Sequence, residues 1–296
     1  MPTPSNYPNG FMGGVVIQGM PVLNSYPGQV WWVDSSAGST GAGTFKSPFS
    51  TIAQAYARCV ANRGDIIMVK PGHTESVTAA GGITLDKAGV QIYGLGSGRT
   101  RPKLTFSTAT SATLLVTGAQ NLIANFIFDL TGIDALAGPL AIQAADFSLL
   151  NSEVIGASAS AQATLGVLTT AAADRMRIAN CRFIGTTDAG MTAAVRIVGG
   201  DGIEIINNSF FGAYGSGNGA IENITTASTN ILIKGNSIIN ATASSTKAIV
   251  AVAGTTGMIC DNRLGILSGL APITSAGAYW AGNYYAAAVA TAGTLV

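Results

Sequence analysis

The chain has 296 residues, 48% of them hydrophobic and only 10% charged, with a formal net charge of +1. This length allows a large buried core, and the balanced charge gives no field that would attract a nucleic-acid backbone or an anionic membrane surface. The three cysteines stand in no CxxC or CxxH spacing, so the sequence predicts no disulfide framework, no metal site and no cofactor.

Residues 1–29 do not share the pattern of the rest of the chain. Three prolines precede position 10, and the apolar stretch GFMGGVVIQGMPVL follows them. An unpaired β-prone segment is a liability unless another surface covers it. We therefore expect an extended N-terminal arm that binds a partner protein through strand pairing or through its apolar residues. These are Phe11, Met12, Val15, Val16 and Ile17. The alternative is that the arm folds back along its own domain.

Residues 30–87 contain the one good amphipathic helical pattern of the chain. The apolar residues of SPFSTIAQAYARCVANRGD, residues 47–65, fall on one helical face: Ile52, Ala55, Tyr56, Cys59 and Val60. Gly64 provides a stop signal after them. We expect this segment to form an N-terminal cap, because a stack of strands has open edges at its ends.

Residues 88–285 contain a repeat. Its best copies are FSLLNSEVIG, MRIANCRFIG, IEIINNSFFG and ILIKGNSIIN, which start at residues 147, 176, 203 and 231. The apolar residue after the turn recurs at steps of 26, 29, 27, 28 and 26 residues: Phe128, Val154, Phe183, Phe210, Ile238 and Leu264. A further apolar series lies between these turns: Ile142, Val167, Val195, Ile221, Ile249 and Ile273.

Short alternating strands with a period in the high twenties are typical of a β-solenoid, in which successive coils stack about 4.8 Å apart. The predicted fold class is therefore all-β. We expect a parallel β-helix of roughly seven coils over residues 88–285, about 30 to 35 Å long. A C-terminal tail, residues 286–296, follows it.

Asparagines mark the turns of the repeat. Asn accepts the left-handed backbone conformation that a sharp turn requires, and stacked Asn side chains can form hydrogen bonds along a column. The sequence predicts a structural Asn ladder in two adjacent columns: Asn125, Asn151, Asn180 and Asn207 in one, and Asn208, Asn236 and Asn262 in the other.

The segment that precedes the repeat has a characteristic order of motifs. Residues 30–77 read VWWVDSSAGSTGAGTFKSPFSTIAQAYARCVANRGDIIMVKPGHTESV: strand, Gly-rich loop, GT, SPF, TI, helix, GD, strand and PG. This order resembles the N-terminal segment of the pectate lyase-like superfamily, and the coils behind it extend the resemblance to about residue 285. The resemblance implies a right-handed parallel β-helix. It implies no single activity, since the superfamily includes lyases, glycosidases, adhesins and bacteriophage head and tail proteins.

Three pairs of opposite charge occupy matching positions in neighbouring coils of the repeat, which predicts structural ion pairs. These pairs are Arg177 with Glu204, Glu153 with Arg182, and Arg196 with Glu222. The one like-signed pair is Asp174 with Asp201, beside Arg175. Two carboxylates about 5 Å apart suit a retaining glycosidase, so these three residues are the catalytic candidates. The alternative, which we favour at this point, is that each Asp caps a turn.

His73 is the only histidine, and it follows a strand in PGHTE. We expect a packed turn residue there. With a single histidine and no nucleophile elbow, the sequence offers no Ser–His–Asp triad.

These observations favour a structural protein of a bacteriophage virion without enzymatic activity, most specifically a head-surface protein that decorates and stabilises the capsid lattice. The basis is the absence of a signal-peptide pattern, the lack of a convincing active site and the presence of an assembly arm. The expected partners are the major capsid protein or other virion proteins and further copies of the chain in a homo-oligomer, with no nucleic acid and no membrane. The alternative is a polysaccharide-cleaving or polysaccharide-binding β-helix that uses Asp174, Arg175 and Asp201, and a bacterial adhesin is a third possibility.

Overall fold

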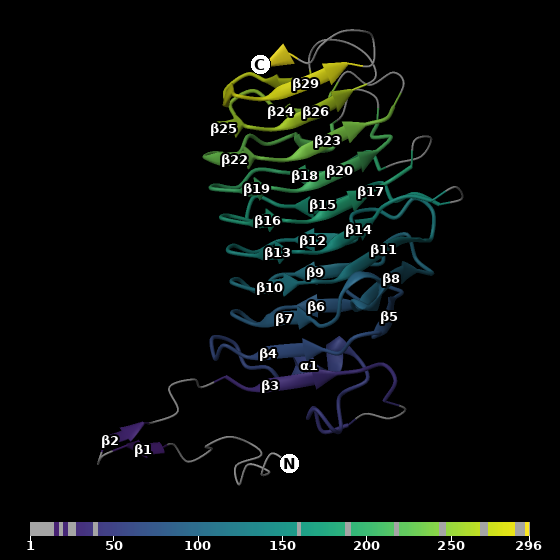
Figure 1. The fold of residues 1–296 in the computed structure, drawn as a ribbon, viewed down its shortest axis with the longest axis vertical. Coiled ribbons are helices and arrows are strands. Elements are labelled where there is room, and N and C mark those ends of the chain that lie inside the picture. Colours follow the sequence, from purple (N-terminus) through teal and green to yellow (C-terminus); the bar gives the residue numbers. More distant parts are fainter. Residues whose placement is uncertain are drawn as a thin grey trace, which may run out of the picture.

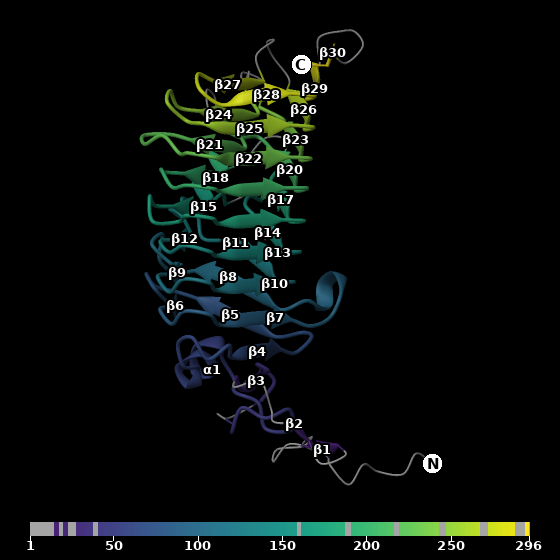
Figure 2. The same cartoon turned by 90° about the vertical axis from the view of Figure 1, so that its left-hand side faces the viewer.

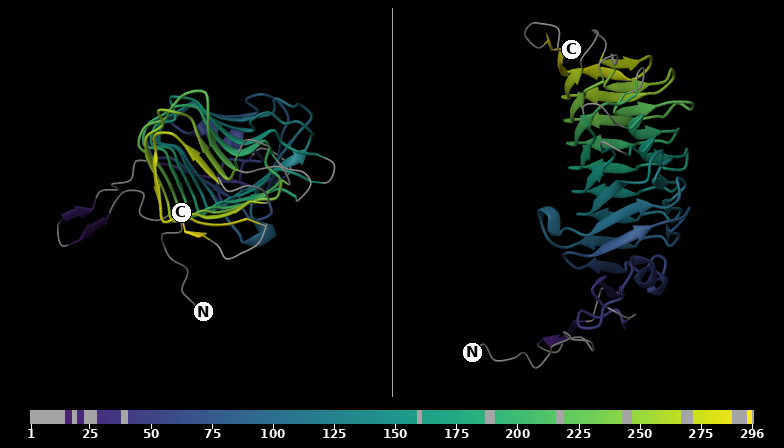
Figure 3. Two further views of the ribbon diagram at one scale, coloured as in Figure 1. Left: turned by 90° about the horizontal axis from the view of Figure 1, so that it is seen from above. Right: turned by 90° about the vertical axis from the view of Figure 1, so that its right-hand side faces the viewer.

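The structure is a computed structural model that describes residues 15–17, 20–22, 28–37, 41–158, 161–186, 191–215, 219–242, 247–266, 272–287 and 294–295. Short strands follow one another around a common axis, and each coil lies on the one before it (Figures 1 and 2). Seen from above, the coils enclose a single interior (Figure 3). The chain therefore forms a right-handed parallel β-helix.

Three long sheets form the walls of the β-helix. The first sheet contains β3 (Val30–Val33), β4 (Ile66–Val69), β7 (Gln91–Gly94), β10 (Leu122–Ala124), β13 (Ser148–Leu150), β16 (Arg177–Ala179), β19 (Glu204–Ile206), β22 (Ile231–Lys234), β25 (Gly257–Cys260) and β28 (Tyr279–Ala281). The second contains β5 (Thr74–Val77), β8 (Lys103–Ser107), β11 (Ile127–Gly132), β14 (Glu153–Ile155), β17 (Arg182–Ile184), β20 (Ser209–Gly212), β23 (Ser237–Asn240), β26 (Arg263–Ile266), β29 (Tyr284–Ala287) and the antiparallel β30 (Thr294–Leu295). The third contains β6 (Ile83–Leu85), β9 (Leu114–Val116), β12 (Leu140–Ile142), β15 (Leu165–Thr169), β18 (Ala193–Ile197), β21 (Ile221–Asn223), β24 (Ile249–Ala251) and β27 (Ile273–Ser275).

One strand of each sheet makes one coil. From β7 to β27 the described chain completes seven such coils, so the predicted β-solenoid of about seven coils is confirmed. The sheets also include β3 to β6, which belong to the range 30–87 that the sequence analysis assigned to a cap.

The core consists of columns of inward side chains. Phe183 lies between Val154 and Phe210 in the strand register, and its ring stacks on that of Phe210 with centroids 4.7 Å apart. All three residues are buried. In the third sheet the register pairs Val167 with Leu140 rather than with the predicted Ile142. The prediction slipped by two residues because both positions face inward and are apolar.

The turn between the first and second sheets answers why Asn recurs in the repeat. Asn125, Asn151, Asn180 and Asn207 all have positive φ, between 52° and 65°. The next position in the turn holds a buried amide column: Asn208, Asn236, Asn262 and Asn283. The side-chain oxygens of Asn236, Asn262 and Asn283 each accept the backbone N–H of the Asn before them, as Asn236 does from Asn208 at 2.9 Å, and Asn208 accepts that of Cys181. The first set therefore shapes the turn, and the second set bonds one coil to the next.

The described helix α1 (Ile52–Arg58) lies near the first coils and packs against β3, β4 and β6. Thr51 accepts the N–H of Gln54 at its start, and Lys87 donates to two carbonyls at its end. A short 3₁₀ helix, η1 (Gly98–Thr100), follows β7. No helix in the described ranges is long and apolar enough to cross a bilayer.

Val15, Val16 and Ile17 form the strand β1 (Val15–Ile17), which pairs with β2 (Met20–Val22) in an antiparallel hairpin. The other two arm residues that the sequence analysis named, Phe11 and Met12, lie outside the described residues. The binding role of the arm therefore stays a prediction.

Candidate functional site

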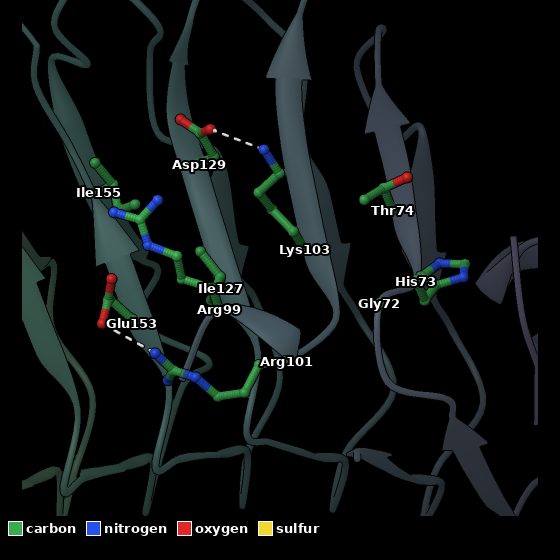
Figure 4. A pocket seen from close by; sticks show the side chains of 10 residues that line it. All are labelled: Gly72, His73, Thr74, Arg99, Arg101, Lys103, Ile127, Asp129, Glu153 and Ile155. Carbon is green, nitrogen blue, oxygen red and sulfur yellow. Dashed lines mark hydrogen bonds and ion pairs between the residues drawn. The ribbon is translucent and has the colours of Figure 1, made fainter. Parts of the chain in front are cut away.

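A cavity of about 370 Å³ opens on the outer face of the second sheet. Its charged lining residues are Arg99, Arg101, Lys103, Asp129 and Glu153, and the rest of its lining includes Thr74, Ile127 and Ile155 (Figure 4). The volume is that of a small-ligand site, where a few convergent polar groups usually fix the orientation of a ligand. A second concavity, lined by Asp134, Gln162 and Thr192, measures about 130 Å³.

Strand alternation places the charged groups on the outside. Leu104 and Phe106 are buried in β8, so Lys103 faces outward, and Phe128 and Leu130 place Asp129 outward in β11 in the same way. Glu153 starts β14 beside Ile127 of β11.

Arg99 and Arg101 come from the loop that connects β7 with β8. Within this loop, Ser97 and Thr100 cap the short helix η1. The guanidinium of Arg101 donates to the carbonyl of Gly98, which fixes its side chain across the loop. This loop therefore brings two guanidinium groups to the rim of a cavity whose floor is made by strands.

The two carboxylates of the cavity are paired with two of its cations. Arg101 donates to Glu153 at 2.9 Å, and the ammonium of Lys103 lies 3.6 Å from a carboxylate oxygen of Asp129. Among the residues that the structure describes, Arg99 has no ion pair. In Figure 4 the side chain of Arg99 extends toward Ile155, in the part of the cavity that also holds Glu153 and Asp129. The cavity thus holds three cations and two anions, a surplus of one positive charge.

The cavity could not be foreseen from the repeat. The register places Glu153 opposite Arg182, as predicted, but Glu153 forms its ion pair with Arg101, from a loop two coils away in sequence. The other two predicted pairs are present, Arg177 with Glu204 at 3.7 Å and Arg196 with Glu222. The aligned apolar series of the repeat begins at Phe128, so Arg99, Arg101 and Lys103 precede every position that it compares.

The structure brings the three candidate catalytic residues together in the turn between the third and first sheets. The carboxylate of Asp174 accepts the backbone N–H of Asp201 at 2.8 Å. Asp201 in turn accepts from Thr229 at 2.6 Å and from Asn230 at 2.8 Å. Arg175 donates two hydrogen bonds to Asp146 in the preceding coil, at 2.7 and 2.9 Å. Each of these side chains therefore bonds to the turn of a neighbouring coil.

Hydrogen bonds favour the ionised form of two acids in this turn. Those from Thr229 and Asn230 lower the pKa of Asp201, and those from Arg175 lower the pKa of Asp146. Both carboxylates are therefore engaged in holding the turns of neighbouring coils together.

His73 is among the residues that line the cavity, but its side chain is fully buried. Its Nδ1 accepts the backbone N–H of Ser35 at 2.9 Å, and its Nε2 lies 3.2 Å from Glu75. The same carboxylate accepts the N–H of Ile52 at the start of α1. The histidine thus joins the helix to the first coils, and its ring is not open to the cavity.

No protein-family model and no curated protein matches the sequence. Solved structures do match the fold. A GH136 lacto-N-biosidase from Eubacterium ramulus has a TM-score of 0.60 and 12% identity, over 87% of this chain and 56% of its own. An alginate lyase from Paenibacillus sp. has a TM-score of 0.53 and 15% identity, over 87% and 95% of the two chains. A rhamnogalacturonan lyase has a TM-score of 0.52 and 14% identity, over 80% and 68%.

At such identities these similarities establish the fold alone. They nevertheless contradict the prediction that the chain is not an enzyme, because all three of these structures carry the name of an enzyme. That prediction took the sparsely charged β-helix as a purely structural element. It also rested on the absence of a convincing site, and it had not considered the cavity on the second sheet.

Proposed function

We propose that the protein binds an acidic polysaccharide in the cavity of the second sheet and cleaves it. The observation that carries the proposal is the surplus cation: among the described residues Arg99 has no acidic partner, while two carboxylates line the same concavity. The enzymes with the same fold are named for polysaccharides or oligosaccharides, which supports a sugar chain as the ligand.

Binding would use the positively charged rim. A guanidinium group bonds a carboxylate through two parallel N–H donors, so Arg99 suits the carboxylate of a uronic acid residue. Lys103 lies on the cavity floor and can move from Asp129 to the same substrate group, because its contact with Asp129 is long. Thr74 and the apolar side chains of Ile127 and Ile155 would face the hydroxyl and C–H groups of the sugar ring.

Cleavage would use the two carboxylates. Asp129 of β11 lies opposite Ile155 of β14, and Ile155 follows Glu153 by two residues on that strand. One strand spacing and a two-residue rise place their Cβ atoms roughly 8 Å apart. Inverting glycosidases hold their two carboxyl groups about 6.5 to 9.5 Å apart, with a water molecule between one of them and the sugar. We assign Glu153, which Arg101 orients through its hydrogen bond, as the base that activates water, and Asp129 as the group that protonates the leaving oxygen.

The test is an activity screen on acidic and neutral polysaccharides, with two readouts that separate the chemistries. Hydrolysis releases reducing ends only, whereas elimination also creates a double bond that absorbs ultraviolet light. We expect reducing ends without absorbance from an acidic chain, loss of activity in Asp129→Asn and Glu153→Gln, and weaker binding in Arg99→Ala. If every acidic polysaccharide is left intact and unbound, the proposal is wrong.

The same screen decides between the two sites. The variants Asp174→Asn and Asp201→Asn test the rival proposal, in which the turn between the third and first sheets is catalytic. Loss of cleavage in these two variants, with full activity in Glu153→Gln, would move the site to that turn.

A location in a bacteriophage virion, on the head surface, is a second proposal that concerns where the protein acts. It is supported by the sequence of residues 1–29, an apolar segment that precedes the β-helix, and by the β1–β2 hairpin within it. In this proposal the arm attaches the protein to the particle, and α1 caps the open end of the β-helix. Removal of residues 1–29 should leave a folded β-helix that no longer associates with particles. Particles that retain the truncated protein would exclude an attachment role for the arm.

A further inference from the structure

The outer face of the first sheet carries few charged side chains. Two columns of outward residues run along its strands. The first runs from Val30 to Tyr279 through Leu122, Arg177, Glu204 and Met258. The second runs from Trp32 to Ala281 through Leu150, Ala179, Ile206 and the exposed Lys234. We call these two columns the apolar face, and Figure 2 shows the sheet with its strands toward the viewer.

The apolar residues of this face are incompletely buried in the single chain. Leu122, Leu150 and Ile206 are half-buried, Met258 is 51% exposed and Tyr279 is 82% exposed. Contiguous apolar surface of this kind on a protein usually marks an interface. The face is a stack of parallel strands, so it presents a regular surface on which a second such stack can lie.

The charges on the face have a symmetric arrangement. Arg177 and Glu204 occupy the same column in adjacent coils, with Leu122 and Met258 each two coils farther out on opposite sides. A two-fold axis parallel to the strands and midway between β16 and β19 would place Arg177 opposite the partner's Glu204, and Leu122 opposite the partner's Met258. In the second column it would place the small Ala179 opposite the partner's Ile206. Leu150 would lie opposite the partner's Lys234, whose ammonium lies 3.5 Å from Asp261 of its own chain. The centre of the face is therefore complementary to itself, as a two-fold interface requires.

A parallel arrangement of two copies lacks this complementarity. An axis along the β-helix would set each coil against the same coil of the partner, and the two columns would exchange places. Arg177 would then face the partner's Ala179, and Glu204 would face the partner's Ile206, which buries both charges against apolar groups at a cost.

We propose that the apolar face binds a second copy of the chain in an antiparallel, two-fold dimer centred between β16 and β19. Eight strands of each copy, β7 to β28, overlap in this arrangement, which gives a contact about 34 Å long and about 12 Å wide from the spacing and rise of the strands. The flat area is about 400 Å² per copy, below the roughly 800 Å² of a standard complex. The dimer is therefore a reversible one.

The experiment measures sedimentation velocity of the full chain over a range of concentrations. The wild type should shift from monomer to dimer as concentration rises. Arg177→Glu and Glu204→Arg should each weaken the dimer by about 10-fold or more, because like charges then face each other twice across the axis. Thermal unfolding of each variant checks that the fold is kept. Arg263→Glu, on the exposed face of the second sheet, is the matched control and should dimerise as the wild type does.

Mixing the two charge variants is the decisive step. Arg177→Glu offers two carboxylates at the centre of the face, and Glu204→Arg offers two guanidinium groups, so the antiparallel dimer is favourable only between unlike copies. We expect each variant alone to be largely monomeric and the mixture to form a heterodimer.

Three results would overturn the proposal. The first is a wild type that stays monomeric at every concentration. The second is a mixture that associates no better than its components. The third is a monomer that becomes a dimer only after residues 1–29 are removed, since the arm of the same chain would then be the occupant of the face.

Discussion

The outer faces of the first and second sheets are built by the same coils and differ in almost everything that a ligand would meet. The first face holds the opposite charges Arg177 and Glu204 at its centre, and apolar side chains surround them. The second face begins with a cavity that has a surplus of positive charge and two carboxylates. Inside, both walls contribute to one continuous core.

This difference shows that fold and function are specified by alternate residues of each strand. Phe210 points inward and stacks on Phe183, while its neighbour Phe211 points outward and is 38% exposed. The inward positions are constrained by the stack, whereas the outward positions are free to differ from sheet to sheet. The β-helix fold by itself therefore does not predict what either face binds.

The largest expected effect is a loss of polysaccharide cleavage when a carboxylate of the second face is removed. Glu153→Gln removes the proposed base and should lower the rate of polysaccharide cleavage by about 10³-fold, within the usual range for a general acid or base. Glu204→Gln makes the same chemical change on the first face and should leave cleavage unchanged. The measurement is the initial rate of reducing-end release at saturating substrate. Equal losses in both variants would mean that the two faces do not differ in this way.

The next effect lies in the core that the two faces share. Phe210→Ala leaves a cavity in a close-packed column and should destabilise the protein by about 3 to 5 kcal/mol. Phe211→Ala, one residue later, removes an outward ring and should cost less than about 1 kcal/mol, in line with surface substitutions. Denaturant unfolding of both variants measures the difference. Similar losses would show that the outer surface contributes to stability as the core does.

A smaller effect separates the two Asn columns at the turn beside the first face. Asn236→Ala removes a side chain that accepts from Asn208 and donates to Ile205 and Asn262, so buried polar groups lose their partners. The expected cost is about 2 to 3 kcal/mol. Asn207→Gly replaces an exposed residue with a φ of 56° by one that tolerates this conformation, and should cost almost nothing. An equal loss in both would contradict the division of roles between the columns.

The fold could be predicted from the sequence because the fold is periodic. The period aligned Phe183 with Phe210 and Ile238 correctly, since inward apolar positions recur at a nearly constant step. It failed where the step changes, as at Ile142, and where a residue comes from outside the repeat. Arg99 and Arg101 lie on a loop with no counterpart in the other coils, so their place beside Glu153 depends on the path of that loop. The spacing of the repeat does not predict the path of this loop.

The smallest effect concerns pH and the turn that borders the first face. Arg175 lowers the pKa of Asp146 through two hydrogen bonds. A lowered folded-state pKa stabilises the protein above the unfolded pKa of about 4, and the contribution is lost as pH falls through the folded value. The pair is largely exposed to solvent, with 57% of the Arg175 side chain accessible, so the contribution should stay below about 1 kcal/mol.

Asp146→Asn should therefore lower the free energy of unfolding slightly at pH 7 and by less at pH 2, because the charge is lost as the pH falls through the folded-state pKa of Asp146. Asp86→Asn, an exposed acid with no ion pair among the described residues, is the control and should change stability at neither pH. Urea unfolding at the two pH values provides the measurement. A loss for Asp146→Asn that persists in full at pH 2 would assign the role of this carboxyl group to its shape in the turn, and the border of the first face would then depend on packing rather than on charge.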